Sequence, residues 1–587
     1  MKRIVLCITV LLVAMLVFSA CDRGGDDTPA ATPPPVEQDQ PDTNQDEPAE
    51  QDEPAAEQDE PAPEARGPLC PMPERIVINV GASFGTPEGN VPPGTTPETQ
   101  TINELLLEHM NIEINYMWMV PSAQGEERFN LAIATGDVPD IMRVNKRNFS
   151  EFLQFGMIRD VTDAFNSYLM PLARESFAYH NDAPLHRVSR DGRLYAIPMV
   201  RDSFQQVQLI WYRNDWAEAL GLSTPTTMDE FHEMAVAFAQ NDMSGQHNTT
   251  GFGLIDNIVT TWMPDARGLF HGYGAYPGAW IERGGELVFG TIQPEVQQAL
   301  NRLRRMYADG GIHHEFATMN LDQLVADIAG DRVGLIMGEW WLPAWPFNQN
   351  IEMNPNADWR ATKIVTPEGT PGTTIIDENN ALVFYVVSAN APVGTEEALV
   401  RMINLHWDIT HNVDALEIYG DRILPENGWV YNWAPAYLNL AAFEQYLNYT
   451  MVNEAIRTGD TSAFFTPGQN NLWRAHHVIN EGYEFDDMSF TDAWGLYTSR
   501  VARHGGWGVT MDVRDAGLFI INRFYGEPTP TELAVFSILN DMWMEFYPRY
   551  IMGDLPYEAW DTFVADWLRL GGADWTREVN EQFSAMQ

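Results

Sequence analysis

Paired tryptophans beside a carboxylate are the residue types in this chain best suited to recognising a ligand. They close the run 331–341, DRVGLIMGEWW, which begins as a buried apolar strand and passes a glycine before its tryptophans. Indole faces cover the C–H face of a sugar, and carboxylates accept hydrogen bonds from the hydroxyls at its rim. The alternative is a tryptophan core packed beneath Pro343 and Pro346. We expect stacking or polar contacts with a sugar from Glu339, Trp340, Trp341 and Trp345.

Other aromatic residues join this candidate set from separate parts of the chain. The region 409–520 is poorly patterned, with helical runs near 441–458 and 470–481, and it supplies two of the added tryptophan candidates. Aromatic side chains in loops favour recognition, although core packing explains many of them. The added candidates are Tyr212, Trp280, Trp494 and Trp507.

A hairpin and an amphipathic helix occupy the stretch 274–316, which must help to position these residues. Gly284-Gly285 supplies the positive φ angles of a tight turn between two short strands. Pro294 suits the first turn of the helix that follows, and Gly310-Gly311 ends it. Apolar residues recur at helical spacing between them, so one face of this helix should be buried: Val296, Leu300, Leu303 and Tyr307.

Strand, helix and strand alternate at the start of the folded body. The pattern predicts strands at 75–80 and 112–118 and a helix at 100–110 between them. Such a crossover implies a parallel pair of strands in an α/β lobe. Thr227, followed three residues later by Glu230, predicts the start of another helix through a capping box.

The N-terminus has the features of an export signal. Lys2 and Arg3 precede the apolar run 4–18, and small residues lead to Cys21. The Ser-Ala-Cys ending resembles the lipobox of bacterial lipoproteins, in which the cysteine carries the lipid; an ordinary cleaved signal is the alternative. We therefore expect residues 1–20 to be a lipoprotein signal peptide and Cys21 to be the lipidation site. Cys70 then has no disulfide partner.

An acidic, proline-rich segment separates this signal from the body. The motif QDEPA occurs at 45–49, 51–55 and 58–62, without any apolar period. We expect residues 21–73 to be the lipidated cysteine and a disordered spacer. Removing the −13 of residues 22–66 and the +2 of the signal from the total of −47 leaves −36 for the body. A net charge this negative disfavours nucleic acid and anionic lipid surfaces as partners of the body.

Six blocks of sequence follow one another in the body in a family-specific order. They are TGDVPDI at 135–141, DGRLYAIP at 191–198, LIWYRNDW at 209–216, PTTMDEF at 225–231, the run 331–341, and NRFYGEPTPT at 522–531. Together they resemble the bacterial extracellular solute-binding proteins of family 1, in particular the large sugar-binding lipoproteins of ABC importers. The resemblance covers about residues 74–583.

The resemblance implies an α/β fold of two hinge-linked lobes, of the type II periplasmic-binding-protein kind, with a ligand cleft between them. We expect 74–200 plus about 385–485 in the N-terminal lobe, and about 201–384 plus about 486–587 in the C-terminal lobe. Hinge crossings are expected near Ile197–Phe204, near Val386–Asn390 and at 485–510. The implied function is capture of an oligosaccharide at the outer face of the membrane and delivery to an ABC permease, without a cofactor.

The family also places a loop that faces the cleft after the strand that ends near 142. That loop would contain three cations able to bond sugar hydroxyls or carboxylates: Arg143, Lys146 and Arg147. A solvated loop explains the same charges. Relatives often carry a calcium-type loop, but here Asp242 is the one carboxylate left, beside Ser244, Gln246 and Thr250. Calcium needs several charged oxygens, so we expect no metal.

The sequence supports an enzymatic function less well than a binding function. GASFG at 81–85 spells a nucleophile elbow, but prolines follow where that elbow needs a helix. Tryptophans with carboxylates also suit a glycosidase, and no motif places two carboxyl groups across a bond. A glycosidase remains the alternative to a binding protein. A surface adhesion module would explain the spacer but not the ordered blocks.

Overall fold

The computed structural model of the chain describes residues 67–84, 99–178, 182–200, 202–259, 265–377, 381–423, 435–436, 438, 444–524 and 526–586. The expected signal, Cys21 and nearly all of the acidic spacer lie outside these residues. The chain from Ala65 onward forms one compact unit. None of the helices in the described ranges is long and apolar enough to cross a membrane.

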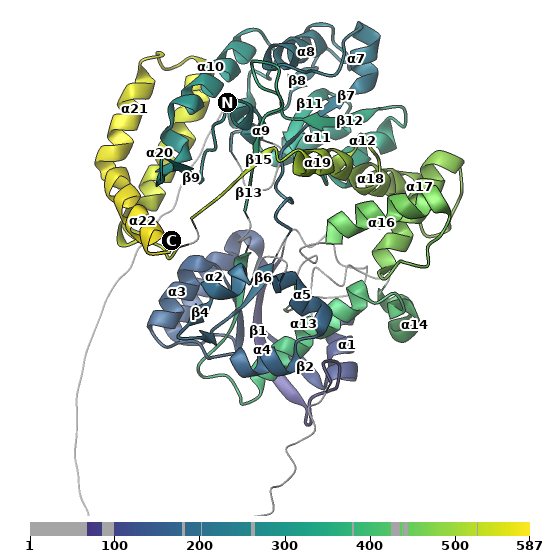
Figure 1. Cartoon of the computed structure of the whole chain (residues 1–587), viewed down its shortest axis with the longest axis vertical. Coiled ribbons are helices and arrows are strands. Elements are labelled where there is room, and N and C mark those ends of the chain that lie inside the picture. Colours follow the sequence, from purple (N-terminus) through teal and green to yellow (C-terminus); the bar gives the residue numbers. More distant parts are fainter. Residues whose placement is uncertain are drawn as a thin grey trace, which may run out of the picture. The chain divides into compact units, whose positions relative to one another are not determined.

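A five-stranded sheet is the centre of what we call the first lobe (Figure 1). In sheet order its strands are β2 (Ile112–Pro121), β1 (Ile76–Phe84), β3 (Ile141–Val144), β14 (Ala381–Val387) and β6 (Ile197–Val200). β1 is parallel to β2 and β3, whereas β14 is antiparallel to β3 and β6. Helix α1 (Thr101–Met110) joins β1 to β2 and buries Leu105 and Leu106, which confirms the expected parallel β-α-β unit.

Short helices and one long helix pack on this sheet. The helix α13 (Thr395–His411) is buried along almost its whole length in the core of the first lobe. The other elements are α2 (Ser122–Thr135), α3 (Lys146–Gln154), α4 (Thr162–Tyr168), α5 (Pro171–Ala178), α6 (Ala183–Arg187), α14 (Ala415–Tyr419) and the small ribbon of β4 (Ser189–Arg190) and β5 (Arg193–Leu194). Ser83 of the elbow-like sequence lies inside β1, paired with Val120, so it does not stand at a strand-to-helix turn.

A four-stranded sheet forms the centre of the second lobe. Its order is β12 (Trp359–Lys363), β7 (Leu209–Arg213), β11 (Val333–Gly338) and β8 (Thr250–Phe252). β7 is antiparallel to both neighbours, and β11 is buried at every residue. Helices on this lobe include α7 (Asn214–Leu220), α8 (Met228–Gln240), α9 (Arg267–Gly272), α11 (Leu321–Ala329) and α12 (Asn348–Met353). Thr227 caps α8 and Glu230 completes the expected capping box.

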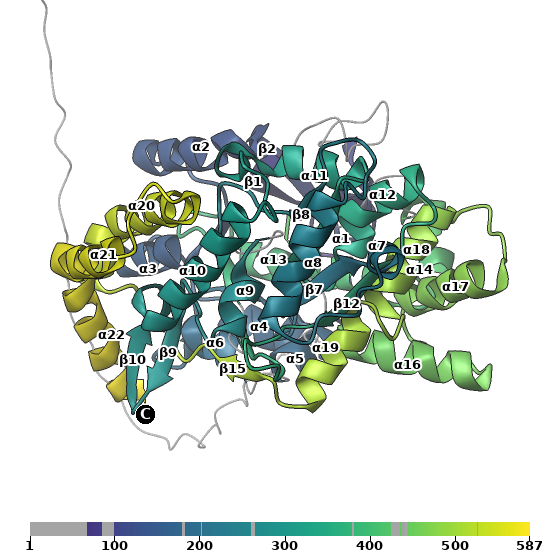
Figure 2. The same ribbon diagram turned by 90° about the horizontal axis from the view of Figure 1, so that it is seen from above.

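The expected hairpin and helix are both present. β9 (Trp280–Arg283) pairs with β10 (Glu286–Phe289), and the turn glycines have φ angles of 65° and 89°. α10 (Pro294–Ala308) begins at its proline and buries Val296, Leu300 and Leu303 of the expected stripe in the second lobe, whereas Tyr307 is partly exposed. The C-terminal helices α20 (Pro530–Met552), α21 (Ala559–Trp567) and α22 (Ala573–Met586) complete this region. Figure 2 shows α20 near α10, where the Tyr547 hydroxyl donates to the Thr291 carbonyl at 2.9 Å.

The helices between 444 and 515 pack against the core of the second lobe, and they also contact α13 of the first lobe, where His411 Nε2 lies 3.2 Å from Glu444 Oε2. They are α16 (Glu444–Thr458), α17 (Pro467–Glu481), α18 (Phe490–Arg500) and α19 (Gly506–Asp515). Tyr446 and Tyr449 of α16 pack against the core that contains Trp340, and Val452 packs with residues of α17 and of the turn after α18. The expected boundary near 485 therefore falls within one packed group of helices.

The second hinge expectation also differs from the structure. Val386 and Val387 belong to the core of the first lobe, and the amide of Ser388 donates to the carbonyl of Asp140 at 2.9 Å. Residues 386–390 are thus inside the first lobe. The chain passes between the two sheets earlier, between β12 and β14, through β13 (Thr374–Ile376), which pairs in parallel with β15 (Phe519–Ile521).

Candidate functional site

The end of β11 carries the candidate aromatic residues. Trp340 is 2% exposed and lies in the core of the second lobe. Its ring contacts Trp507 of α19, with centroids 6.0 Å apart, and the Arg500 guanidinium lies 4.7 Å from its centroid on the same ring. Trp507 is 1% exposed. Both indoles are therefore core residues, in agreement with the packing alternative for these two positions.

Trp341 and Trp345 differ from them because both remain partly exposed. Their rings lie nearly parallel, with an interplanar angle of 14° and centroids 6.3 Å apart. The backbone at Trp345 is extended, with φ of −170° and ψ of 131°, inside the otherwise helical turn Pro343–Phe347. This kink lets two side chains four residues apart present parallel faces. We call this pair the indole pair.

A buried carboxylate holds the indole pair in place. The Trp341 Nε1 group donates a hydrogen bond of 2.8 Å to Glu339 Oε2. Glu339 is 5% exposed, and its other oxygen, Oε1, lies 3.5 Å from Arg267 Nη2. Asp265, which is fully buried, accepts from Arg267 Nε at 2.8 Å. Two carboxylates thus share one guanidinium beneath Trp341.

The electrostatics of this cluster follow from its burial. Burial raises the pKa of Glu339 to about 7, and Arg267 and the Trp341 hydrogen bond oppose that rise only in part. Arg267 keeps a raised pKa despite its burial, because Asp265 and Glu339 surround it. Near neutral pH the Glu339 carboxyl group is therefore neutral in part of the molecules and ionised in the rest.

α18 completes this surface from a distant part of the chain. Gly495 approaches the turn so closely that a Cβ there would lie 3.0 Å from Ala344 Cα. Trp494, one residue earlier, is partly buried and packs against the same core as Trp341. The structure thus brings together six predicted residues: Glu339, Trp340, Trp341, Trp345, Trp494 and Trp507.

Two predicted aromatic residues lie elsewhere. Tyr212 is 3% exposed, and its hydroxyl is 2.7 Å from Thr224 Oγ1 in a different core cluster. Trp280 is buried among Phe289, Phe524 and Trp575, at centroid distances of 5.1, 6.1 and 5.2 Å. Both side chains are covered by the second lobe rather than placed beside the indole pair.

The cations of the first lobe do not lie on a loop, so that expectation is wrong. Arg143 is in β3, and α3 starts at Lys146 because Asn145 accepts a hydrogen bond from the amide of Asn148 at 2.9 Å. Arg147 is exposed and pairs with Glu151 at 3.1 Å, one turn along α3. Lys146 lies over the ring of Phe524 at 5.3 Å. Arg143 remains exposed.

The calcium-type loop is closed by its own hydrogen bonds. The Asp242 carboxylate accepts from Ser244 Oγ at 3.2 Å, from Thr249 Oγ1 at 3.0 Å and from the His247 amide at 2.9 Å. Gln246 donates to the Gly330 carbonyl instead, and Thr250 is buried in β8. In the described ranges no group of three or more His, Cys, Asp or Glu side chains is placed to hold a metal ion.

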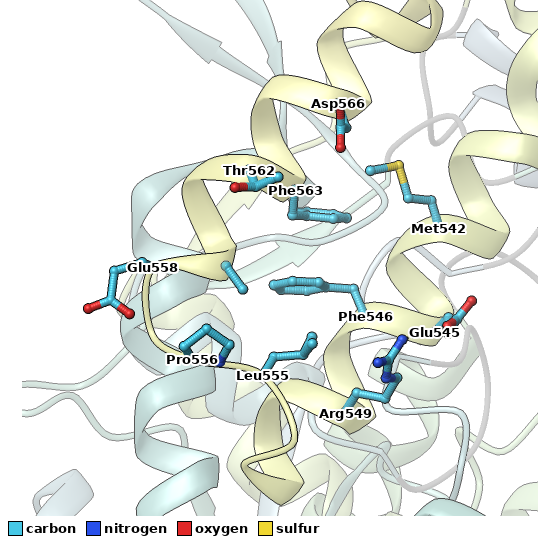
Figure 3. Close-up of a pocket in the computed structure, with 11 residues that line it drawn as sticks. Met542, Glu545, Phe546, Arg549, Leu555, Pro556, Glu558, Thr562, Phe563 and Asp566 are labelled. Atoms are coloured by element: carbon cyan, nitrogen blue, oxygen red, sulfur yellow. Dashed lines mark hydrogen bonds and ion pairs between the residues drawn. The ribbon is translucent and has the colours of Figure 1, made fainter.

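A separate hollow of about 520 Å³ lies between α20 and α21. Figure 3 shows Phe546 and Phe563 facing each other there; their rings stack with centroids 4.4 Å apart. Charged side chains surround this apolar floor: Glu545, Arg549, Glu558 and Asp566. None of the predicted ligand residues lines it.

Sequence reasoning missed Arg267, Asp265 and Arg500. Each lies far along the chain from residues 339–345, and no local spacing connects them with the tryptophans. A buried charge needs a partner, so the buried Glu339 required a cation nearby, but the pattern of residues did not say which one.

Curated relatives agree with the resemblance over part of the chain. A polygalacturonan/rhamnogalacturonan-binding protein of Bacillus subtilis (strain 168), YtcQ, is 28% identical over 248 residues, which are 41% of this chain and 47% of that protein. Lipoprotein LipO of the same organism is 25% identical over 232 residues, which are 38% of this chain and 44% of that protein. The alignments therefore span less than half the length of either relative.

Solved structures agree with the fold over nearly the whole described body. The alginate-binding protein AlgQ2, solved without calcium ion, superposes with a TM-score of 0.60 at 14% identity and covers 88% of this chain and 100% of its own. The Streptococcus pneumoniae ABC-transporter substrate-binding protein FusA in complex with kestose gives a TM-score of 0.60 at 15% identity, with 87% and 99% covered. At such identities the likeness shows the fold, which is that of two-lobed periplasmic binding proteins.

The model of one family matches residues 93–399, more than half of the chain, and this range runs from before β2 to beyond β14 and so includes strands of both lobes. The chain belongs to the bacterial extracellular solute-binding protein family.

Proposed function

We propose that this protein is the extracytoplasmic, lipid-anchored substrate-binding component of an ABC importer, and that it captures an oligosaccharide for delivery to the membrane permease. The family supports a solute-binding role outside the cytoplasm. The names of the relatives support a sugar: polygalacturonan and rhamnogalacturonan for one, kestose for another. The lipid anchor would be Cys21, and a lipoprotein relative supports it.

The observation that carries the proposal is the indole pair. Trp341 and Trp345 present two nearly parallel, partly exposed faces, and the Glu339 hydrogen bond fixes the first of them. A fixed apolar face loses little entropy on binding and suits the C–H face of a pyranose or furanose ring. Two stacked, partly exposed indoles offer a larger apolar surface to a sugar than one ring alone.

Capture would proceed by closure of the two lobes. A sugar that touches both lobes stabilises the closed form by as much as it binds that form better than the open one. We infer that the described segments that run between the sheets, 202–208 and 364–377, act as hinges. The first of them overlaps the hinge predicted at Ile197–Phe204.

Tryptophan fluorescence against a panel of sugars tests the proposal. The chain from Asp22 onward, without lipid, would be titrated with oligogalacturonates, alginate oligomers and fructo-oligosaccharides, and the sugars recovered by chromatography. We expect a saturable change in fluorescence and a raised Tm with at least one sugar, because a ligand that binds only the folded state stabilises it. The Trp341→Ala variant should lose most of this response.

Trp473→Ala is the matched control. Trp473 is a partly buried tryptophan of α17, in T-shaped contact with His477, and it lies in a different hydrophobic cluster from the indole pair. It should keep the wild-type affinity. If Trp341→Ala and Trp345→Ala both bind as tightly as wild type while sugar still binds, the indole pair is not the site.

The same experiment separates binding from catalysis. Glu339 has the raised pKa that a glycosidase acid requires, but it is 5% exposed and is engaged with Trp341 and Arg267. A glycosidase needs a second carboxyl group across the scissile bond. Recovery of intact sugar after prolonged incubation supports the binding protein. Recovery of cleaved sugar would make the protein an enzyme.

A further inference from the structure

The block NRFYGEPTPT at 522–531 leaves the second lobe and contacts the first. It begins directly after β15, where the amide of Asn522 donates to the Ile376 carbonyl at 2.9 Å. Phe524 belongs to the aromatic cluster of the second lobe, 9% exposed and in contact with Trp280. Thr529 then caps α20, which packs in the second lobe. Both ends of the block are therefore fixed to the second lobe.

Glu527, between these fixed ends, is bound by two elements of the first lobe. Ser150 Oγ of α3 donates to one carboxylate oxygen, and Arg190 Nη2 of β4 donates to the other. These partners are 377 and 337 residues away along the chain. One carboxylate thus joins two separate elements of the first lobe to the second lobe.

Neighbouring charges make this contact complementary. Lys146 of α3 lies over Phe524, and burial lowers its pKa to about 8 while Glu532 and Glu527 counteract that effect. Arg187 of α6 is held near Asp377 and Glu527. The first lobe supplies cations here and the second lobe supplies carboxylates. The chain has 35 Lys and Arg residues against 82 Asp and Glu residues, and Lys146 is one of only two lysines after residue 3. A local group of cations is therefore unusual for this acidic protein.

We propose that Glu527, with Phe524, forms a latch that stabilises the closed arrangement of the two lobes and so sets the affinity for ligand without touching it. This inference rests on the proposed function, because it takes lobe closure as the event that captures the sugar. Glu527 acts as a positioning residue. Contacts between the lobes in this arrangement favour it over any arrangement that lacks them, and even a modest contact shifts an equilibrium balanced within a few RT.

The exposure of the Arg190 and Glu527 side chains sets the expected loss of sugar affinity when the pair is removed. The side chains of Arg190 and Glu527 are 38% and 40% exposed, so water and salt screen their attraction. Loss of the pair should therefore weaken sugar affinity by about 1.5- to 5-fold rather than abolish binding. The loss should appear mainly as faster release, because most affinity changes caused by altered contacts lie in the dissociation rate.

Charge reversal and its rescue test the latch without any sugar. Small-angle X-ray scattering would compare the radius of gyration of the ligand-free wild type with Glu527→Arg, Arg190→Glu and the double variant, at low and high salt. We expect each single variant to have a larger radius than wild type and the double variant to lie between them, because a cation at position 527 still faces Lys146 and Arg187. High salt should bring the radii of wild type and single variants closer together, since it screens both the attraction and the repulsion.

Arg147→Glu, Glu151→Arg and their double variant form the matched control, because this pair is an exposed ion pair within α3 alone. None of the three should change the radius. Glu527→Gln serves if a reversed charge prevents folding, since the amide keeps the shape and removes the charge. Wild-type radii in both Glu527 variants at equal Tm, or a double variant as open as the singles, would overturn the latch.

The outcome is independent of the proposed ligand. If no sugar in the panel binds but the radii follow the reversal and rescue, the latch holds and the oligosaccharide assignment fails. If sugar binds and the radii do not change, the oligosaccharide assignment holds and the latch fails.

Discussion

Replacement of Glu339 by glutamine isolates the energetic role of the charge beneath the indole pair. Burial raises the pKa of this carboxyl group from 4.5 to about 7. Between those values the unfolded chain releases the Glu339 proton while the folded chain keeps it. Stability then falls as pH rises, because the folded state binds more protons than the unfolded state. Below pH 4.5 both states are protonated, and the contribution of Glu339 is fully present.

The magnitude follows from the size of the shift. A rise from 4.5 to about 7 corresponds to about 3 kcal/mol of free energy of unfolding, at 1.36 kcal/mol for each pH unit. Glu339→Gln has no proton to release, so it lacks this dependence. Wild type should therefore lose about 3 kcal/mol relative to the variant between pH 4.5 and pH 8. The other titrating groups are common to both chains and cancel in the difference.

Urea denaturation followed by tryptophan fluorescence measures this difference at steps of half a pH unit. Equal m-values in the two chains ensure that the midpoints report stability. Glu368→Gln, which replaces an exposed carboxylate of the second lobe, is the control and should track wild type at every pH. A wild-type-minus-Glu339→Gln difference that stays flat, or that rises with pH, would refute the argument that burial dominates the environment of this carboxyl group.

Three further predictions follow from the same structure. Trp340→Ala should lower the free energy of unfolding, measured by urea denaturation, by about 3 to 5 kcal/mol, because it leaves a large cavity in a packed core. A loss as small as that caused by replacing an exposed residue would show that the indole is not packed. Thr227→Ala should lower the free energy of unfolding by about 1 kcal/mol through loss of the capping box of α8, measured against Ser223→Ala, which replaces an exposed serine of the preceding loop. Calcium at millimolar concentration should leave Tm unchanged in wild type and in Asp242→Asn alike, since Asp242 is satisfied by its own loop; a calcium-dependent rise in wild type alone would contradict this interpretation.

Local patterns predicted most of the elements that support the site. The turn glycines of β9 and β10, the proline at the start of α10 and the capping box of α8 each depend on neighbours within a few residues. Such signals act over short distances, so they can be read without knowledge of the fold. The strand β11 was equally clear because it is apolar at nearly every position and buried on both faces.

Long-range packing decided which aromatic residues stay accessible. Trp340 and Trp341 are adjacent in the sequence, yet the first is 2% exposed and only the second presents part of its ring. Adjacent residues leaving a strand point in different directions, and α19 covers one of those directions with Trp507. The residues near 340 do not indicate that a helix more than 160 residues later will cover one of the two tryptophans. The sequence alone therefore predicts the same exposure for both.

Lys146 shows why a charge in a sequence motif does not by itself indicate a ligand. The family resemblance favoured a loop, but Asn145 caps a helix at that point, and the first turn of α3 directs Lys146 onto Phe524. Opposing effects then set the pKa of Lys146. Burial disfavours the charged amine and lowers the pKa to about 8, while the ring face of Phe524 and two carboxylates favour the charged form. A cation that contacts an aromatic residue of the other lobe is already partnered before any sugar arrives. Its replacement by methionine should therefore change lobe closure, read as the radius of gyration of the ligand-free chain, rather than the choice of sugar.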